Sequence, residues 1–495
     1  MGSETMSLIT MKFGGTSVGS AERIRQAAEI VRDARRDHAL VVVISALSGI
    51  TDLIIAAAND ACAGNNACLE EHLKQVERRH DQVIGELFSG ESRACVQAEV
   101  ATVLNDLREF CGALLKFRAV TPQLLDVALP MGERMSAPIV AAALRQLGVN
   151  GKAFDSKEFL ITNENFGDAV PDMDATARLS GERLLPFVNQ GGVPVVTGYQ
   201  GGTAAGQATT LGRGGSDYSA TILGAALNCD EIWIWTDVDG VMSADPRICP
   251  DATILPEITF AEAIEMSYYG AKVVHRKAVR PAMERGIPVL IKNSFRPDVE
   301  GTRIAAQAQR NGHVVKAVTA VHPAALLTLT VPNVGHFEDL FGRLFLSLGH
   351  ERIDVLFSTH SSSENALGLV FREQDLERAL AAADRVFRTE IKHSVMAPIA
   401  VQRDIAVIAV LGETMKGKCG VLARLFTAVA RCNVSVIAVA QGASELNICF
   451  AVSAASVPVV VRSVHDEFLR QAADPLHAHR SGDDDEKYFA SRCCS

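Results

Sequence analysis

Short apolar runs without polar interruption alternate with helical patterns over residues 8–300, and this alternation constrains the fold more than any other feature. Four of the runs are typical of buried strands: residues 39–45, 193–197, 231–236 and 288–291. A strand that is apolar on both faces must be covered on both faces, as in a mostly parallel sheet flanked by helices. The sequence therefore predicts an α/β domain with three layers, in which helices cover both faces of a mostly parallel sheet.

The N-terminal segment combines a strand, a glycine turn and a helix. Residues 8–13 form the expected strand, Gly14 and Gly15 follow it, and a helical pattern runs over residues 21–35. Unpaired N–H groups at a helix N-terminus favour an anion, and Lys12 adds a full positive charge. The segment has neither the Gly-Lys-Ser/Thr ending of a P-loop nor a GxGxxG pattern, so P-loop ATPases and Rossmann dehydrogenases are disfavoured.

A second glycine-rich segment covers residues 209–217 and precedes another apolar helical pattern. Its glycines allow backbone N–H groups to approach phosphate oxygens, and Arg213 can form a bidentate contact with a carboxylate or phosphate. Asp217 can hold a neighbouring cation. Taken alone, the segment fits a purely structural role as a tight turn and helix cap as well as it fits phosphate binding.

Seven segments, taken in order, resemble the aspartate kinase family and leave little room for chance. They are residues 12–17, 45–51, 132–134, 209–217, 236–241, 245–247 and 270–275. The resemblance implies the three-layer amino-acid-kinase fold and an ATP-dependent enzyme that converts L-aspartate to 4-phospho-L-aspartate and ADP, the first step of lysine, threonine and methionine biosynthesis. Because a carboxylate acceptor is already ionised at pH 7, this reaction requires no general base.

The resemblance also assigns roles to individual residues. Lys12 would neutralise the transferred phosphoryl group, Asp217 would orient Lys12 while also capping the following helix, and Arg213 completes the expected catalytic set. A guanidinium matches a carboxylate, and a carboxylate matches the α-ammonium group of an amino acid. The implied contacts to aspartate are Ser45, Thr51, Glu133 and Arg213.

The nucleotide is expected beside the two glycines and in the loop that follows the strand over residues 231–236, since α/β proteins bind ligands at strand ends. Arg247 and Lys272 have an alternative interpretation as surface cations with packed aliphatic stems. Magnesium would be held mainly by the nucleotide phosphates and water, and no residues show the spacing of a zinc site. The implied nucleotide contacts are Lys12, Gly14, Gly15, Thr236, Asp237, Arg247 and Lys272.

The C-terminal part contains an internal repeat with a constant offset of 81 residues. Residues 342–345 match 423–426, residues 353–355 match 434–436, and the pair at 363–364 matches that at 444–445. Each copy is predicted to follow the ferredoxin-like βαββαβ plan and resembles the ACT domains that sense amino acids. The second copy is most similar to that of aspartate kinases fused to homoserine dehydrogenase, but we expect no dehydrogenase domain here.

The resemblance implies that threonine or lysine binds the ACT units and inhibits the enzyme. The alternative for the polar turn of the second copy is ordinary edge-strand polarity. Because a lone ACT unit leaves a sheet edge open, we also expect a homodimer or higher homo-oligomer through these units. The expected effector contacts are Gln441, Ser444, Glu445, Ser362 and Ser363.

Composition and length complete the prediction. The 495-residue chain has a net charge of −10 without a basic stretch, no apolar run long enough to span a membrane, and 11 scattered cysteines without a CxxC pair. These features argue against nucleic-acid and membrane partners and favour a cytoplasmic protein with free thiols. The expected divisions are a kinase domain (8–300), a linker (301–318), two ACT units (319–400 and 401–475) and a polar tail (476–495).

Two other functions stay open. One is another kinase of the same fold, acting on glutamate or acetylglutamate, against which the two ACT copies and residues 45–51 count. The other is an amino-acid-sensing protein with an inactive kinase half, against which the presence of Lys12, Glu133 and Arg213 counts. An assay of ADP release with aspartate separates all three.

Overall fold

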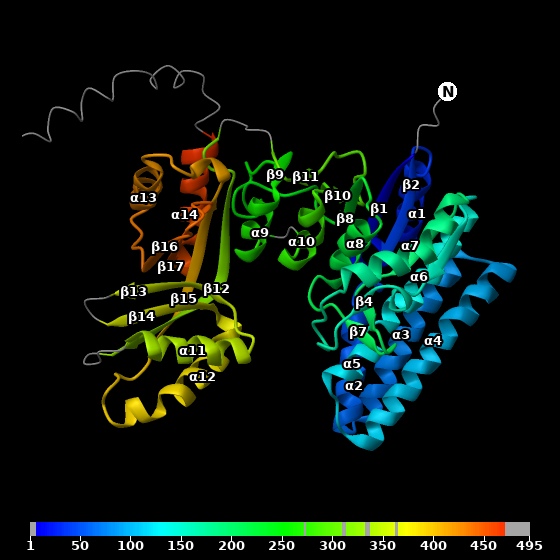
Figure 1. The fold of residues 1–495 in the computed structure, drawn as a ribbon, viewed down its shortest axis with the longest axis horizontal. Helices are drawn as coiled ribbons and strands as arrows, with labels where there is room; N and C mark the ends of the chain where they lie inside the picture. The colour runs from blue at the N-terminus through cyan, green and yellow to red at the C-terminus, as the bar shows by residue number, and fades with distance from the viewer. Residues whose placement is uncertain (1–5, 272–273, 309–312, 332–336, 362–364, 471–495) are drawn as a thin grey trace, which may run out of the picture. The chain divides into compact units, whose positions relative to one another are not determined.

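The computed structural model describes residues 6–271, 274–308, 313–331, 337–361 and 365–470. These residues form two compact units (Figure 1). The first unit contains the described residues up to 241 together with residues 254–267 and 274–308. The second unit contains residues 242–253, 268–271 and the described residues from 313 onward. The functional boundaries expected from the sequence stay a prediction, and the polar tail lies outside the described residues.

The first unit is built on an eight-stranded sheet with the order β3-β5-β2-β1-β8-β10-β11-β9. All neighbours from β3 to β10 are parallel, β11 is antiparallel to β10, and β9 is parallel to β11. The predicted mostly parallel sheet is thus confirmed. The strands are β1 (Ser7–Phe13), β2 (His38–Ile44), β3 (Gly151–Phe154), β5 (Val193–Thr197), β8 (Glu231–Thr236), β9 (Glu257–Thr259), β10 (Val289–Asn293) and β11 (Thr302–Ala305).

Alternation along β1 separates the two faces of this sheet. Ile9, Met11 and Phe13 are buried in one core with α1 and α6, whereas Thr10 and Lys12 point to the opposite face, which α8 covers. A strand with a period of two residues therefore places an apolar set against one helix layer and Lys12 against the other. The helices are α1 (Ala21–Ala34), α2 (Ile50–Ala63), α3 (Asn66–Leu87), α4 (Gly90–Phe117), α5 (Pro122–Ala128), α6 (Met131–Gln146), α7 (Met173–Asn189), α8 (Gly215–Ala226), α9 (Phe260–Tyr268) and α10 (Arg276–Arg285).

A small second sheet lies in the same unit. It contains β4 (Ile161–Thr162), β6 (Gln200–Thr203) and β7 (Ala208–Thr210) in the order β4-β6-β7. β7 leads directly into the glycine-rich segment before α8, so this sheet positions that segment. No helix in the described part of the chain has the length and apolarity needed to cross a membrane.

The second unit is built on a six-stranded antiparallel sheet with the order β13-β14-β12-β15-β17-β16. The strands are β12 (Ala317–Thr330), β13 (Val355–Ser361), β14 (Ala366–Arg372), β15 (Ala400–Leu411), β16 (Ala438–Gln441) and β17 (Asn447–Ser453). The helices are α11 (Phe337–His350), α12 (Glu373–Lys392), α13 (Val421–Arg431) and α14 (Val457–His465).

The internal repeat is visible as two equivalent halves of this sheet. The matching segments 342–345 and 423–426 lie on α11 and α13, and each helix is followed by a hairpin, β13–β14 or β16–β17. The long strands β12 and β15 run through both halves. Residues 317–321 of β12 pair with 407–411 of β15, and beyond a register shift β12 continues against both β14 and the beginning of β15. The two copies therefore share strands.

Residues 242–253 lie between two segments of the first unit in the sequence but belong to the second unit. Ala244 and Cys249 are buried in the same apolar core as Val460 and Leu425. The amide of Val318 donates to the carbonyl oxygen of Ser243 at 2.8 Å. We call residues 242–253 the inserted segment. Its core partners belong to strands and helices of the second unit.

Candidate active site

The carboxyl ends of three adjacent parallel strands bring the predicted loops together. β1 ends before Gly14, β2 ends before Ser45, and β8 ends before Asp237. Backbone bonds join these ends, since the amide of Ser45 donates to Phe13 and the amide of Gly14 donates to Trp235. Parallel strands end at one edge of the sheet, which is where ligands bind in α/β folds.

A cavity of about 740 Å³ lies at this edge, entirely within the first unit. The N-terminal ends of α2, α6 and α8 contribute to its wall through Thr51, Glu133 and Asp217. Three helix ends that face one space favour anionic ligands there. The predicted site residues that line the cavity are Lys12, Gly14, Gly15, Ser45, Thr51, Glu133, Arg213, Asp217, Thr236 and Asp237.

Lys12 and Asp217 form an ion pair across the floor of the cavity. Lys12 is the penultimate residue of β1, Asp217 lies in the first turn of α8, and their Nζ and Oδ1 atoms are 2.5 Å apart. Both side chains are mostly buried. The pair fixes the direction of the ammonium group while leaving its other N–H donors for a ligand.

Glu133 is a buried carboxyl group at the cavity wall. Only 4% of the residue is exposed, and its Oε2 atom has no hydrogen-bond partner among the described residues. Burial raises the pKa of Glu133 to about 8, while backbone N–H groups of Ala46 and Glu133 itself and the charge of Lys12 oppose this rise in pKa. A buried carboxyl with a free oxygen is suited to bind a cation.

The Gly132-Glu133 sequence is explained by packing. A Cβ atom at Gly132 would lie 2.7 Å from the Cβ atom of Ala46, so only glycine lets α6 approach the loop after β2 this closely. Ser136 on the next turn of α6 donates to the carbonyl oxygen of Ser45 at 2.7 Å. These contacts hold Glu133 beside the predicted aspartate contacts of that loop.

Arg213 projects from the glycine-rich segment, is exposed, and has no ion-pair partner among the described residues. The backbone around it demands glycine: Gly212 has φ +76°, and a Cβ atom there would lie 2.7 Å from Oδ1 of Asp168. Asp168 is in turn paired with Lys277 of α10. The segment is thereby held with an uncommitted guanidinium at the cavity.

Sequence reasoning missed several residues of the cavity wall, of which Tyr199 and Gly167 are the most informative. Tyr199 has a positive φ of 70°, an unusual conformation for a bulky residue that is typical of functional sites. Its amide donates to Ser219 Oγ, and its carbonyl oxygen accepts from Leu211. The available signal was its place just after the predicted strand over residues 193–197.

Two predicted nucleotide contacts do not belong to the described part of the first unit. Arg247 belongs to the inserted segment of the second unit, where its guanidinium forms a two-pronged contact with Asp245. Lys272 lies outside the described residues. Both stay predictions.

Three of the predicted effector residues lie in the described part of the second unit. Gln441 ends the edge strand β16 and is exposed, as is Ser444 in the turn before β17. Glu445 has a positive φ of 57°, and its Oε2 atom accepts from the amide of Gly417 at 2.8 Å. Ser362 and Ser363 lie outside the described residues.

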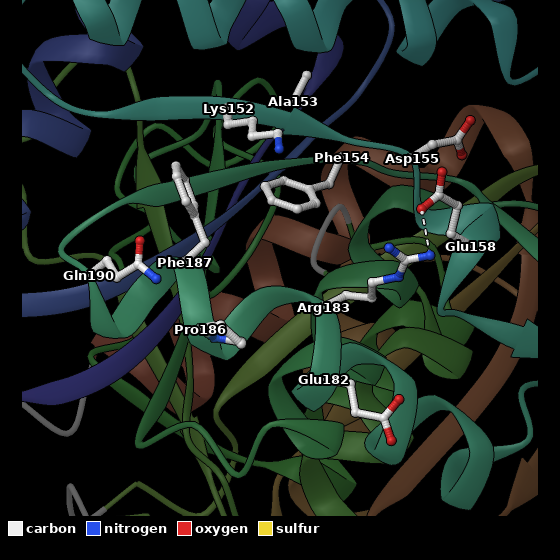
Figure 2. A pocket seen from close by; sticks show the side chains of 10 residues that line it. All are labelled: Lys152, Ala153, Phe154, Asp155, Glu158, Glu182, Arg183, Pro186, Phe187 and Gln190. Carbon is white, nitrogen blue, oxygen red and sulfur yellow. Dashed lines mark ion pairs between the residues drawn. The ribbon is translucent and has the colours of Figure 1, made fainter.

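A second hollow lies at the free edge of β3, with a volume of about 490 Å³. Figure 2 shows the rings of Phe154 and Phe187 turned toward each other, with centroids 5.7 Å apart, and the Arg183–Glu158 pair nearby. We call this hollow the β3 groove. Its charged groups are exposed: the Arg183 and Glu158 side chains are 60% and 57% accessible.

Comparison with known proteins agrees with this geometry. The amino acid kinase family matches residues 7–293, and an ACT domain matches residues 408–468. Lysine-sensitive aspartokinase 3 of Escherichia coli is 32% identical over 93% of this chain and 99% of that protein. A bifunctional aspartokinase/homoserine dehydrogenase of Haemophilus influenzae is 29% identical, and the chain spans only 56% of its length.

Solved structures give the same result. The crystal structure of E. coli aspartokinase III in complex with aspartate and ADP (R-state) superposes with a TM-score of 0.79 and 30% identity, covering 93% of this chain and 99% of that one. The chain spans about half the length of the bifunctional relatives. The agreement in cavity, sheet order, family models and full-length relatives shows that the chain belongs to the aspartokinases of the amino acid kinase family.

Proposed function

We propose that the protein is an ATP-dependent aspartate kinase that transfers the γ-phosphoryl group of ATP to the side-chain carboxylate of L-aspartate. The observation that carries this proposal is that one cavity contains the buried Lys12–Asp217 pair, the free oxygen of Glu133 and the uncommitted guanidinium of Arg213. These groups match the charges of an amino acid and a phosphate. The aspartate and ADP bound by E. coli aspartokinase III support the same assignment.

On the nucleotide side, Gly14 and Gly15 offer backbone N–H groups to the phosphates, and Thr236 and Asp237 line the same cavity. Lys12 neutralises charge on the transferred group in a loose transition state, and Asp217 keeps its ammonium in place. Arg247 and Lys272 complete the proposed nucleotide contacts. Because the phosphates themselves supply oxygen ligands, Mg²⁺ is held mainly by the nucleotide and water.

On the aspartate side, Arg213 forms a two-pronged contact with a carboxylate, and Glu133 binds the α-ammonium group. Ser45 and Thr51 lie on the same wall. The attacking oxygen of aspartate carries its own negative charge, so bond formation to phosphorus and departure of ADP require positioning and charge neutralisation without a base.

The deciding experiment measures ADP release with aspartate, glutamate and N-acetylglutamate in parallel. We expect turnover with aspartate and little with the other two, because N-acetylglutamate lacks the ammonium group that Glu133 binds. Turnover with glutamate or acetylglutamate alone would assign a different kinase of this fold. Nucleotide and amino-acid binding without ADP release would indicate a sensing protein with an inactive kinase half.

We further propose that lysine or threonine inhibits the enzyme through the second unit, with Gln441, Ser444, Glu445, Ser362 and Ser363 as contacts. The lysine sensitivity of the E. coli relative supports lysine as the first effector to test. Gln441→Ala should raise the inhibitory concentration while sparing uninhibited turnover, since coupling needs differential contacts with the effector. An unchanged inhibition curve would remove Gln441 from the effector site.

Assembly and location complete the proposal. The strands β13 and β16 are the edges of the six-stranded sheet, and Leu422 and Val439 are exposed apolar residues of that unit, which supports a homo-oligomer formed through it. Light scattering at several protein concentrations tests this. The free thiols of buried cysteines such as Cys111 and Cys229 support a reducing cytoplasmic location.

A further inference from the structure

Asp126 on α5 is fully buried, with 0% exposure, and is not among the residues that line the cavity. No cation pairs with it among the described residues. Its carboxylate is instead satisfied by neutral donors: Oδ2 accepts from the amides of Gly167 and Thr210 at 2.8 and 3.0 Å, and Oδ1 accepts from Thr210 Oγ1 at 2.6 Å. Both oxygen atoms are therefore used.

The three donors belong to two segments that form one wall of the cavity. Gly167 lines the cavity itself, and Thr210 is the last residue of β7, three positions before Arg213. The amide of Ala169 donates to the carbonyl oxygen of Thr210 at 2.9 Å, so the two segments are also joined directly. Asp126 thus lies behind this wall and holds both segments from one point.

A backbone hydrogen bond connects the segment held by Asp126 with another residue of the cavity wall. The single hydroxyl hydrogen of Thr210 is donated to Asp126, and the amide of the next residue, Leu211, donates to the carbonyl oxygen of Tyr199 at 2.9 Å. Tyr199 lines the cavity. The carboxylate therefore orients the backbone before Arg213, and this backbone in turn contacts the main chain of Tyr199.

The charge of Asp126 distinguishes this arrangement from ordinary packing. Burial raises the pKa of Asp126, and the hydrogen bonds from Thr210 and Gly167 oppose this rise. A buried charge without a counter-ion is costly, whereas charge-assisted hydrogen bonds are stronger and more directional than neutral ones. Such a group suits a place where the geometry of a neighbouring segment matters.

We propose that Asp126 is a positioning residue that sets the cavity wall carrying Arg213 and thereby determines the affinity for the amino-acid substrate. This inference rests on the proposed aspartate kinase activity. Asp126 acts through Gly167 and Thr210 and does not touch the reacting atoms. The nucleotide contacts at Gly14 and Gly15 are on other elements, so ATP use should be insensitive to Asp126.

The test is Asp126→Asn in the full-length protein. An amide has the same shape but only one acceptor oxygen, so at least one of the three donors loses its partner. We expect KM for aspartate to rise about 10- to 100-fold because small displacements of positioning groups have effects of that size, with KM for ATP unchanged. Thr210→Val removes only the hydrogen bond from the Thr210 hydroxyl group to Asp126. It should raise the KM for aspartate as well, but by a smaller factor.

Asp172→Ala is the matched control, because Asp172 caps α7 by accepting from the amide of Ala175 and does not line the cavity. It should lower Tm without changing KM for aspartate. If Asp126→Asn lowers Tm and leaves both KM values unchanged, the positioning role is overturned. If Asp126→Asn does not fold, an unchanged KM for aspartate in Thr210→Val overturns it instead.

Hydrogen exchange separates this inference from the proposed function. Asp126→Asn should accelerate amide exchange at residues 167 and 210–213 in the unliganded protein, whereas Asp172→Ala should not. If the wild-type protein releases no ADP with aspartate, the proposed function fails. The exchange data then still decide whether Asp126 holds the wall, and unchanged exchange overturns the inference.

Discussion

The active-site cavity and the β3 groove lie in the same unit, and they differ mainly in how far their charged side chains are exposed to water. In the cavity, Lys12 and Asp217 are mostly buried and hold each other in an ion pair. In the groove, Arg183 and Glu158 are more than half exposed and pair across 3.6 Å. Water already satisfies exposed charges, so a ligand gains little from them. Buried, oriented charges identify a site better than cavity size.

The largest expected effect comes from Lys12→Ala. Removing one preorganised charge from the transferred group should lower kcat by about 10²-fold or more, because such groups act mainly in the transition state. Lys152→Ala in the β3 groove is the control and should leave kcat unchanged. ADP release at saturating substrates measures both. Near-normal kcat in Lys12→Ala, with an unchanged fold by circular dichroism, would remove the distinction between the two cavities.

Glu133 should make the KM for aspartate depend on pH. Since burial raises its pKa to about 8, the carboxyl is protonated in the unliganded protein at neutral pH and cannot pair with an ammonium group. KM for aspartate should therefore fall about tenfold or more as the pH rises from about 6.5 to 8.5, whereas Glu133→Gln should give a higher, flat profile. Parallel pH profiles for the two proteins would contradict this.

Glu133 should also make the stability of the unliganded protein depend on pH: stability should fall as the pH rises, while the affinity for aspartate increases. A carboxyl whose pKa is raised on folding contributes stability below its ordinary pKa, and this contribution is lost as the pH rises toward about 8. The unliganded wild-type protein should lose Tm relative to Glu133→Gln over this range. Saturating aspartate should reduce the loss, because binding stabilises the ionised form. Scanning calorimetry with and without aspartate measures both effects.

Arg213→Lys should have a smaller effect, confined to one substrate. A compact ammonium cannot reproduce the two-pronged contact of a guanidinium with a carboxylate, so KM for aspartate should rise about tenfold while KM for ATP stays unchanged. Initial rates with each substrate varied in turn separate the two constants. A rise in KM for ATP alone would assign Arg213 to the nucleotide.

The smallest effect is expected in the β3 groove. Arg183→Ala breaks an exposed ion pair with Glu158, and such pairs contribute at most about 1 kcal/mol. Turnover and both KM values should stay within about twofold of wild type, and Tm should barely change. A specific loss of aspartate or ATP affinity would mean that the groove takes part in substrate binding.

The sequence predicted the parts of the site that follow from local pattern. Strand ends and glycines pointed to Lys12, Gly14 and Asp237, and the family resemblance added Ser45. The structure brings these residues to one cavity, because adjacent parallel strands end at one edge of the sheet. The predicted parallel sheet and the repeat were confirmed as well. These features depend on side-chain periodicity and on glycine, which are legible without tertiary contacts.

Other parts depend on contacts between segments far apart in the chain. Asp126 is 84 residues from Thr210, and nothing beside it in the sequence indicates that its carboxylate will be buried against β7. Likewise, Ala244 and Cys249 are small apolar residues in the sequence whichever core buries them, so their burial in the second unit could not be foreseen. Tyr199 required knowledge of its backbone conformation.

The inserted segment means that the chain passes between the two units more than once, so a single cut cannot release a complete kinase half. A fragment ending near residue 308 would lack Val315, Val318 and all of α14, and would leave Ala244 and Cys249 without the core that covers them. Cys249, whose thiol pKa burial raises to about 11, would then become open to alkylating reagents. Gene fusion, truncation and domain exchange in this enzyme must therefore carry residues 242–253 together with the partners that bury them.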